Sequence, residues 1–241
     1  ENKKHFFEKL IYLPDCYLIN PSIRQVSNKE HSKSSFGLPE ESFVFCCFNN
    51  SYKIMPSIFV SWINIIKNIK NSVLWLAETN MEAKKNLLNI ASSSGIGPKR
   101  IIFAKRELLI EDHLVRYKMV DLFLDTFPFN GHTTACDALY LGVPLLTITG
   151  NSLASRVGAS LLTNLNIKKL ITYNDIDYEE KAIFLANNPN ILNMIKDKIL
   201  KNKEIKPLFN SKLSTISLEK AYKKIHLKYK SGIIPHSFEV E

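Results

Sequence analysis

The chain has 241 residues, of which 45% are hydrophobic, and a formal net charge of +9. This is enough apolar material to bury the core of one large domain, or of one and a half smaller ones. No run of about 18 apolar residues is present, so we expect no transmembrane helix. The first residues, Glu1 to His5, contain no apolar stretch and are not expected to be a signal peptide.

Strand-like apolar segments alternate with helical patterns along the chain. Five segments are predicted to be strands: 43–48, 73–76, 100–104, 120–124 and 144–148. Helices are predicted from Pro56 through Ile69, then at 82–91, 111–117 and 134–141. After Ser152 the pattern is helical, with one short apolar break near Leu170. This alternation predicts an α/β fold with a doubly wound, Rossmann-like parallel sheet, whose ligands sit beyond the carboxyl ends of the strands.

The positive charge is concentrated near the end of the chain. Between Lys196 and Lys230 there are 11 lysines against Asp197, Glu204 and Glu219, a net charge of +8. Such a stretch could bind nucleic acid or anionic lipid. Because its charge is all lysine and arginine is absent from it, we expect a solvated helical face instead, and no nucleic-acid or membrane partner.

The cysteine pattern does not suggest a metal site. The four cysteines, at positions 16, 46, 47 and 136, contain no Cys-x-x-Cys pair. Cys46 and Cys47 are adjacent in a predicted strand, so their side chains would point to opposite faces of the sheet. We therefore expect no zinc site and a reduced, cytoplasmic protein.

The junction after the fourth predicted strand has the features of a phosphate site. That strand ends at Asp125, a loop follows, and His132 opens the next helix. A helix N-terminus at the carboxyl edge of a sheet offers free backbone N–H groups and the positive end of a dipole. The hydroxyls of Thr133 and Thr134 would add donors, and Asp137 lies one turn further on the same face. Thr134 and Asp137 also fit a capping box, so structural capping remains an alternative.

Two further candidates lie near the same edge. Lys53 follows the first strand and its loop, where an ammonium group could face a nucleotide diphosphate; an ordinary surface lysine is the alternative. His113 lies just inside a predicted helix start behind Glu111 and Asp112, where a solvated histidine is the alternative.

Several motifs together resemble the C-terminal catalytic half of bacterial protein O-GlcNAc transferases, of the tetratricopeptide-repeat and SPINDLY-like family. The matching stretches follow the order of the family, from about residue 40 to about residue 230. They are Phe48-Asn49-Asn50-Ser51-Tyr52-Lys53-Ile54, Asn71 to Leu76, Glu111-Asp112-His113-Leu114, Asn130-Gly131-His132-Thr133-Thr134, Asp137 to Pro144, and Gly150 to Ser160.

The resemblance implies a fold, an activity and a donor. The fold would be the C-terminal half of a GT-B glycosyltransferase with a helical C-terminal region. The activity would be inverting transfer of GlcNAc from UDP-GlcNAc to serine or threonine of proteins, with no metal or other cofactor. No general base is assigned.

The resemblance also implies roles for individual residues. Lys53 would contact the diphosphate as the catalytic residue, and Asn50 would contact the nucleotide. His113 would pack against the uracil base, with Arg116 in the same pocket. The backbone edge that reads the base would come from Leu108, Leu109 and Ile110, and the diphosphate would bind at His132, Thr133 and Thr134.

Departures from the animal enzymes affect two parts of this site. Ile110 stands where those enzymes have a lysine, which leaves Asp137 as the clearer ribose partner. The loop after Leu76 is shorter, as in many bacterial relatives. The one Asp-x-Asp element, Asp175-Ile176-Asp177, lies outside the motifs, so Lys53 and the helix start would stabilise the diphosphate without a metal.

The resemblance divides the chain in two. Residues 1–38 resemble the closing segment of the N-terminal catalytic domain and its linker, and residues 39–241 the nucleotide-sugar-binding domain. An N-terminal catalytic domain and tetratricopeptide repeats would lie upstream in the full-length protein, so we expect the 241-residue chain alone to be inactive.

Two alternatives to this activity remain. A protein O-fucosyltransferase using GDP-fucose shares the architecture, but relatives of that kind lack the histidine found here as His132. A non-catalytic nucleotide-sugar-binding module would be expected to have lost Lys53, His113 or the His132-Thr133-Thr134 run, and all are present.

Overall fold

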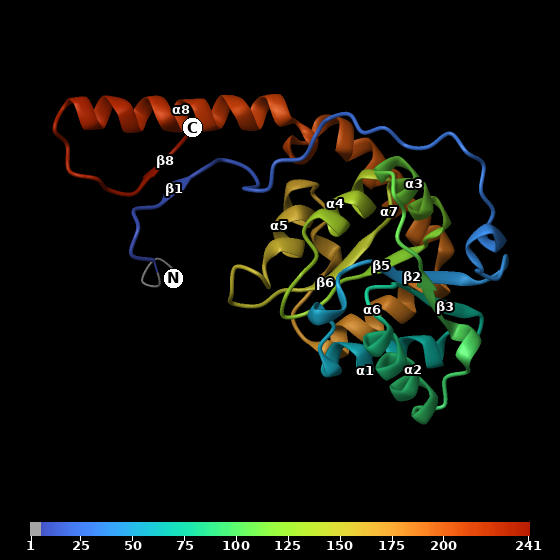
Figure 1. Ribbon diagram of the computed structural model, residues 1–241. Helices are drawn as coiled ribbons and strands as arrows, with labels where there is room; N and C mark the ends of the chain where they lie inside the picture. The colour runs from blue at the N-terminus through green and yellow to red at the C-terminus, as the bar shows by residue number, and fades with distance from the viewer. Residues whose placement is uncertain (1–5) are drawn as a thin grey trace.

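The computed structural model describes residues 6–241, so the five residues considered for a signal peptide lie outside it. A six-stranded parallel sheet forms its centre (Figure 1). Its strands are β2 (Phe43–Cys47), β3 (Ser72–Ala77), β4 (Ile101–Ala104), β5 (Leu122–Leu124), β6 (Leu145–Ile148) and β7 (Ile171–Thr172). The predicted α/β fold is confirmed, and β7 accounts for the apolar break near Leu170.

Helices cover both faces of this sheet (Figure 1). One face carries α1 (Pro56–Asn68), α2 (Met81–Ser93) and α6 (Asp175–Asn187). The other carries α3 (Ile110–Val115), α4 (Thr133–Tyr140), α5 (Val157–Asn164) and α7 (Pro189–Ile205). Local signals start several of them: Pro56 occupies the first turn of α1, and the side chain of Asn80 caps α2 by accepting from the Ala83 N–H.

Buried polar aromatics join one helical layer to the sheet. Trp62 of α1 and Tyr178 of α6 are fully buried. The indole N–H of Trp62 donates to the Tyr178 hydroxyl over 3.1 Å, and that hydroxyl donates to the carbonyl of Asp125 over 3.1 Å. Because each polar group finds a partner, the core fixes the end of β5 at no desolvation penalty.

The strand order reverses at the middle of the sheet. The order is β4-β3-β2-β5-β6-β7, so the chain winds outward in one direction from β2 and in the other from β5. Ligands of doubly wound sheets bind in the crevice at such a reversal, beyond the carboxyl ends of the strands. The loops that follow β2 and β5 carry Lys53 and His132, so the fold brings two predicted site residues to this crevice.

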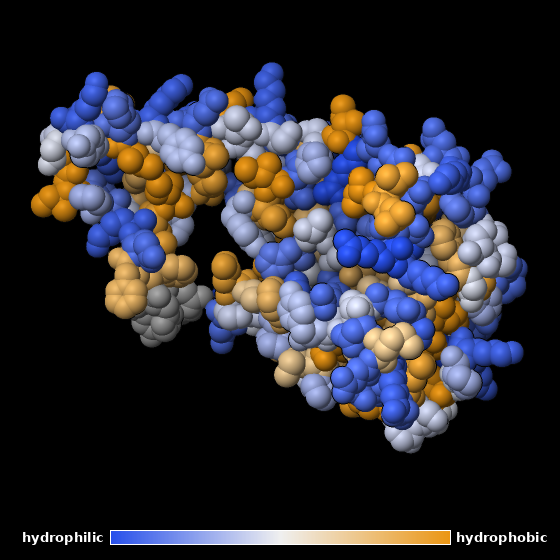
Figure 2. Space-filling view, viewed as in Figure 1, coloured by the Kyte–Doolittle hydropathy of each residue, from blue (hydrophilic) through white to orange (hydrophobic). Residues whose placement is uncertain are grey.

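A separate arm extends from the sheet domain (Figure 1). We use this term for α8 (Ser211–Lys230), β8 (Phe238–Glu239) and the segment around β1 (Ile11–Tyr12), whose strands β1 and β8 pair in parallel. Figure 2 shows apolar side chains gathered on the arm, and Tyr222, Leu227 and Tyr229 of α8 are more than half exposed. Over residues 6–241, no helix is long and apolar enough to cross a membrane.

The segment before the sheet contacts the sheet domain directly. The backbone N–H of Ser27 donates to the carbonyl of Glu111 over 3.2 Å, and Lys29 pairs with Asp112 at 3.0 Å. The sheet itself begins at Phe43, close to the predicted domain boundary after residue 38. Assignment of residues 1–38 to another catalytic domain and its linker stays a prediction.

Candidate functional site

An open pocket of about 530 Å³ lies at the carboxyl ends of β2, β3 and β4. The sides of the pocket nearest the strands are lined by the residues at the strand ends, Phe48, Ala77 and Ala104. Six residues that the sequence assigned to nucleotide binding also line it: Asn50, Leu108, Leu109, Ile110, His113 and Arg116. The structure therefore places the predicted base-binding residues together, although they come from two separate loops.

The ring of His113 forms one wall of this pocket. It packs against Phe48 and Tyr117, with ring centres 5.8 and 5.6 Å away. Burial and, to a smaller extent, the nearby Arg116 lower the pKa of His113 to about 4, against the opposing effect of Glu107. The imidazole is therefore neutral at physiological pH and presents a flat, uncharged surface, which suits contact with a planar base.

Arg116 shapes the loop on the other side of the pocket. Its guanidinium is 5% exposed and donates to the carbonyl of Lys105 and to the carboxylate of Glu107. These bonds hold the loop between β4 and α3 in place. Leu108, Leu109 and Ile110 follow with largely exposed side chains, so their backbone is close to the open side of the pocket.

A second cluster lies around Asn130, in the loop after β5. The ammonium of Lys53 donates to the carbonyl of Asn130 over 3.0 Å and lies 3.9 Å from the centre of the Phe129 ring. Nδ1 of His132 lies 3.1 Å from the same carbonyl. Because a carbonyl can only accept, Nδ1 carries the hydrogen, and Nε2 of a neutral ring is left as an acceptor. Burial lowers the pKa of both Lys53 and His132.

Helix α4 begins beside this cluster without a side-chain cap. His132 is its N-cap residue and makes no capping hydrogen bond. The capping-box alternative for Thr134 is wrong, because its hydroxyl donates instead to Oδ1 of Asn49. Thr133 is exposed and makes no side-chain hydrogen bond to residues 6–241. The first turn of α4 thus keeps the free N–H groups that a phosphate requires.

A buried carboxylate that the sequence did not mark as a site residue organises this loop. Asp125 accepts from the N–H of Gly131 over 2.6 Å and from the hydroxyl of Thr147 over 2.8 Å. It also accepts from Nδ2 of Asn49 over 3.3 Å, which links the ends of β2 and β5 across the reversal. Burial raises the pKa of Asp125 to about 6, and these hydrogen bonds oppose the rise.

The same contacts explain the glycine before α4. A Cβ on Gly131 would lie 2.9 Å from Oδ1 of Asn49 and 3.1 Å from the Thr134 hydroxyl oxygen. Asn49 and Gly131 both belong to motifs quoted above, but 82 positions separate them along the chain. The quoted motifs could therefore have identified these two residues as parts of one site, whereas local periodicity could not.

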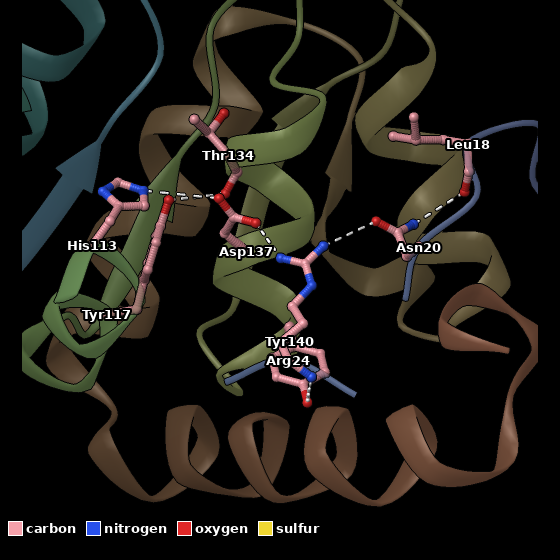
Figure 3. Close-up of polar contacts among 8 residues, drawn as sticks. All are labelled: Leu18, Asn20, Arg24, His113, Tyr117, Thr134, Asp137 and Tyr140. Carbon is pink, nitrogen blue, oxygen red and sulfur yellow. Dashed lines mark hydrogen bonds and ion pairs between the residues drawn. The ribbon is translucent and has the colours of Figure 1, made fainter. Parts of the chain in front are cut away.

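Asp137 connects the pocket to helix α4 (Figure 3). Its side chain is 3% exposed; Oδ1 pairs with the guanidinium of Arg24, and Oδ2 lies 3.8 Å from Nε2 of His113. Burial raises the pKa of Asp137, and Arg24 opposes this. Beside it, the hydroxyl of Tyr117 donates to the carbonyl of Thr134 over 3.1 Å. Sequence reasoning missed Arg24, which lies 113 positions before its partner.

The described residues show no metal-binding cluster. Over residues 6–241, no three His, Cys, Asp or Glu side chains come close enough to hold a metal ion. Asp175 and Asp177 of the Asp-x-Asp element lie in the first turn of α6, where the N–H of Asp177 donates to the capping Asn174. All four cysteines are free and buried.

Comparison by sequence relates this chain to one family. The profile of glycosyl transferase family 41 matches residues 23–218. A probable UDP-N-acetylglucosamine–peptide N-acetylglucosaminyltransferase SEC from Arabidopsis thaliana is 34% identical over 98% of this chain and 25% of its own length. The corresponding enzyme of Caenorhabditis elegans is 32% identical over 84% of this chain and 18% of its own length. The chain thus spans a quarter or less of these two relatives.

Comparison by structure gives the same fold. A solved variant of Thermobaculum terrenum O-GlcNAc transferase superimposes with a TM-score of 0.70 and 22% identity, over 89% of this chain and 44% of that one. Sucrose-phosphate synthase from Thermosynechococcus elongatus gives 0.62 at 9% identity, over 87% and 51%. These matches confirm the GT-B type of fold predicted from the sequence.

Proposed function

Because this chain belongs to glycosyl transferase family 41, we propose that it is the donor-binding half of a protein O-glycosyltransferase that moves GlcNAc from UDP-GlcNAc to serine or threonine hydroxyls. One observation carries this proposal: the pocket lined by Asn50 and neutral His113 and the uncapped start of α4 both lie at the carboxyl edge of the sheet. Asn49, next to Asn50, accepts from Thr134 of α4, and the ammonium of Lys53 donates to the loop before that helix. Uracil would occupy the pocket, and the diphosphate would bind at the helix start.

The chemistry of transfer fits this arrangement of charge. The acceptor oxygen forms a bond to the anomeric carbon while the bond from that carbon to UDP breaks, and the acceptor proton passes to a base. Negative charge grows on the departing diphosphate in this step. The ammonium of Lys53 and the free N–H groups of α4 are preorganised cations and donors for it, so no metal ion is required. No residue of this chain is assigned as the base.

The rest of the family assignment belongs to the same proposal. The acceptor would be a protein, and an N-terminal catalytic domain with tetratricopeptide repeats would precede these residues in the full protein. A reducing compartment such as the cytoplasm suits four free, buried cysteines.

Titration of the 241-residue chain with nucleotides by calorimetry tests the donor assignment. We expect UDP to bind more tightly than GDP, and EDTA to leave the affinity unchanged. Lys53→Ala should weaken UDP binding at least about tenfold, since one charge-assisted contact is lost. Lys70→Ala, an exposed lysine between α1 and β3, is the matched control and should bind like the wild type. Equal binding of GDP, or an unchanged affinity in Lys53→Ala, would refute the proposal.

A further inference from the structure

Arg24 reaches from the segment before the sheet domain to the carboxylate of Asp137 (Figure 3). The arginine side chain is 11% exposed and is held from several sides. Its Nη2 donates to Oδ1 of Asn20 over 3.3 Å, its backbone N–H donates to the hydroxyl of Tyr140 over 3.0 Å, and its guanidinium lies 5.2 Å from the centre of that ring. A cation held in this way stabilises the negative charge of its partner, the Asp137 carboxylate.

That partner does not line the pocket but lies behind its wall, next to His113. Oδ1 of Asp137 is taken by Arg24, whereas Oδ2 faces Nε2 of His113 at 3.8 Å and accepts no hydrogen bond from residues 6–241. Of these three residues, Arg24, Asp137 and His113, only His113 lines the pocket. Arg24 therefore acts on the pocket through one intervening carboxylate, although it does not line the pocket itself.

We propose that Arg24 is a positioning residue of the nucleoside site: by neutralising Asp137 it keeps the ring of His113 uncharged and in its place in the pocket wall. The identity of the nucleoside rests on the proposed function, but the effect of Arg24 on His113 does not. Arg24 follows β1 along the chain, so the segment that leaves the arm contacts the carboxylate behind His113.

The physical argument is one of charge balance around a buried acid. The charged or titratable side chains near the pair are Arg24 and Cys136 on the side of Asp137, Tyr117 beside the ring of His113, and Arg116 and Glu107 near that ring. Burial raises the pKa of the Cys136 thiol to about 12, so it stays neutral. Without Arg24, the buried carboxylate lacks a cation, and the nearest group able to become one is the imidazole. An imidazolium would close the 3.8 Å gap, occupy Oδ2 and turn its ring out of the pocket wall.

Nuclear magnetic resonance of the 241-residue chain measures this effect directly. The titration of His113, assigned by the loss of its signals in His113→Gln, should move to higher pH in Arg24→Met. It should stay near the wild type in Arg24→Lys, which keeps the charge. In Arg24→Met combined with Asp137→Asn it should return to low pH, because no carboxylate remains to attract the proton. Arg24→Gln provides the same comparison should Arg24→Met not fold.

Affinity for UDP provides the second readout. Near neutral pH, Arg24→Met should bind UDP roughly tenfold more weakly than the wild type. The ratio of the UDP affinity of Arg24→Met to that of the wild type should approach one as the pH rises, because His113 then deprotonates in the variant. Taking this ratio cancels the ionisation of UDP itself. The matched control is Lys29→Met, which breaks the other ion pair between the same segment and the sheet domain, with Asp112, and should change neither readout.

The outcomes separate the inference from the proposed function. An unchanged titration of His113 in Arg24→Met would overturn the inference. So would an equal, pH-independent loss of affinity in Arg24→Met and Lys29→Met, since it would show that the segment acts only as a structural tether. Failure of the wild type to bind UDP would refute the proposed function, while the His113 titration would still test the charge coupling.

Discussion

Asp125 joins more parts of the candidate site than any residue selected from the sequence for binding. Its carboxylate accepts from the loop before α4, from β6 and from the end of β2. A Cβ atom at Gly158 would lie only 2.7 Å from Oδ2 of Asp125. Helix α5 therefore also packs directly on this carboxylate. One buried carboxylate thus positions both the loop before α4 and helix α5.

The same burial gives Asp125 a measurable effect on stability. Its pKa is raised to about 6 in the folded chain, against about 3.9 when unfolded. Between these values the folded chain holds a proton that the unfolded chain has released, so this group's contribution to stability falls as pH rises through the window. Relative to Asp125→Asn, the wild type should lose about 2 kcal/mol of unfolding free energy from pH 4 to pH 7.

Urea unfolding at several pH values measures this difference. Asp175→Asn, at the exposed start of α6, is the control for replacing an aspartate by asparagine. Parallel pH profiles of Asp125→Asn and the wild type would show that the buried group does not titrate in this window.

At the scale of single elements, the start of α4 separates two threonines that look equivalent in the sequence. Thr134 donates to Oδ1 of the buried Asn49, whereas Thr133 is exposed and has a free hydroxyl. Thr134 therefore fixes the helix against the end of β2. Of the two hydroxyls, that of Thr133 is the one available to donate to a phosphate.

Two valine substitutions test this division of roles. Thr134→Val leaves the buried Asn49 oxygen without its donor and should cost about 1–3 kcal/mol of unfolding free energy. Thr133→Val should leave stability unchanged and weaken UDP binding by roughly ten- to a hundredfold, the effect of losing one hydrogen bond to a charged group. Chemical denaturation and calorimetry report the two quantities. The opposite assignment, with stability lost in Thr133→Val alone, would contradict the structure.

Periodicity predicted most elements but few of their contacts. The five predicted strands and the helix beginning at Pro56 are present, because alternating apolar segments report local burial. The two-residue strand β7 is too short to give a period of its own. The pairing of β1 with β8 joins Ile11 to Phe238, and no local pattern encodes such a distant partner.

For the candidate site, too, the sequence predicted the location of residues but not their distant partners. Motif resemblance predicted Lys53, His113 and His132 at the carboxyl edge of the sheet, where the structure has them because each follows a strand; their roles stay predictions. It did not indicate the ion pair of Asp137 with Arg24, which lies outside every quoted motif. Residue types at a strand end predict the location of a site, whereas the partners that set their charge come from distant parts of the chain.

At the scale of the whole molecule, the described residues would supply only the donor side of the proposed reaction. The candidate donor residues, from Asn50 to Asp137, all lie in the six-stranded sheet domain. The arm instead presents exposed apolar side chains on α8 (Figure 2). Exposed apolar surface of this kind favours association, so we expect the isolated chain to self-associate at high concentration.

We predict that this 241-residue chain binds UDP but does not transfer sugar. Transfer requires the acceptor hydroxyl to be held in line with the anomeric carbon, and such orientation contributes several orders of magnitude to the rate. Residues 6–38 contribute only the two-residue strand β1 and a short 3-10 helix at Lys33–Phe36, and no described residue is assigned to the acceptor. Calorimetry with UDP, together with mass spectrometry of an acceptor peptide incubated with UDP-GlcNAc, separates binding from transfer. A full-length family 41 enzyme is the positive control, and robust glycosylation by the 241-residue chain would show that its own residues build the acceptor site.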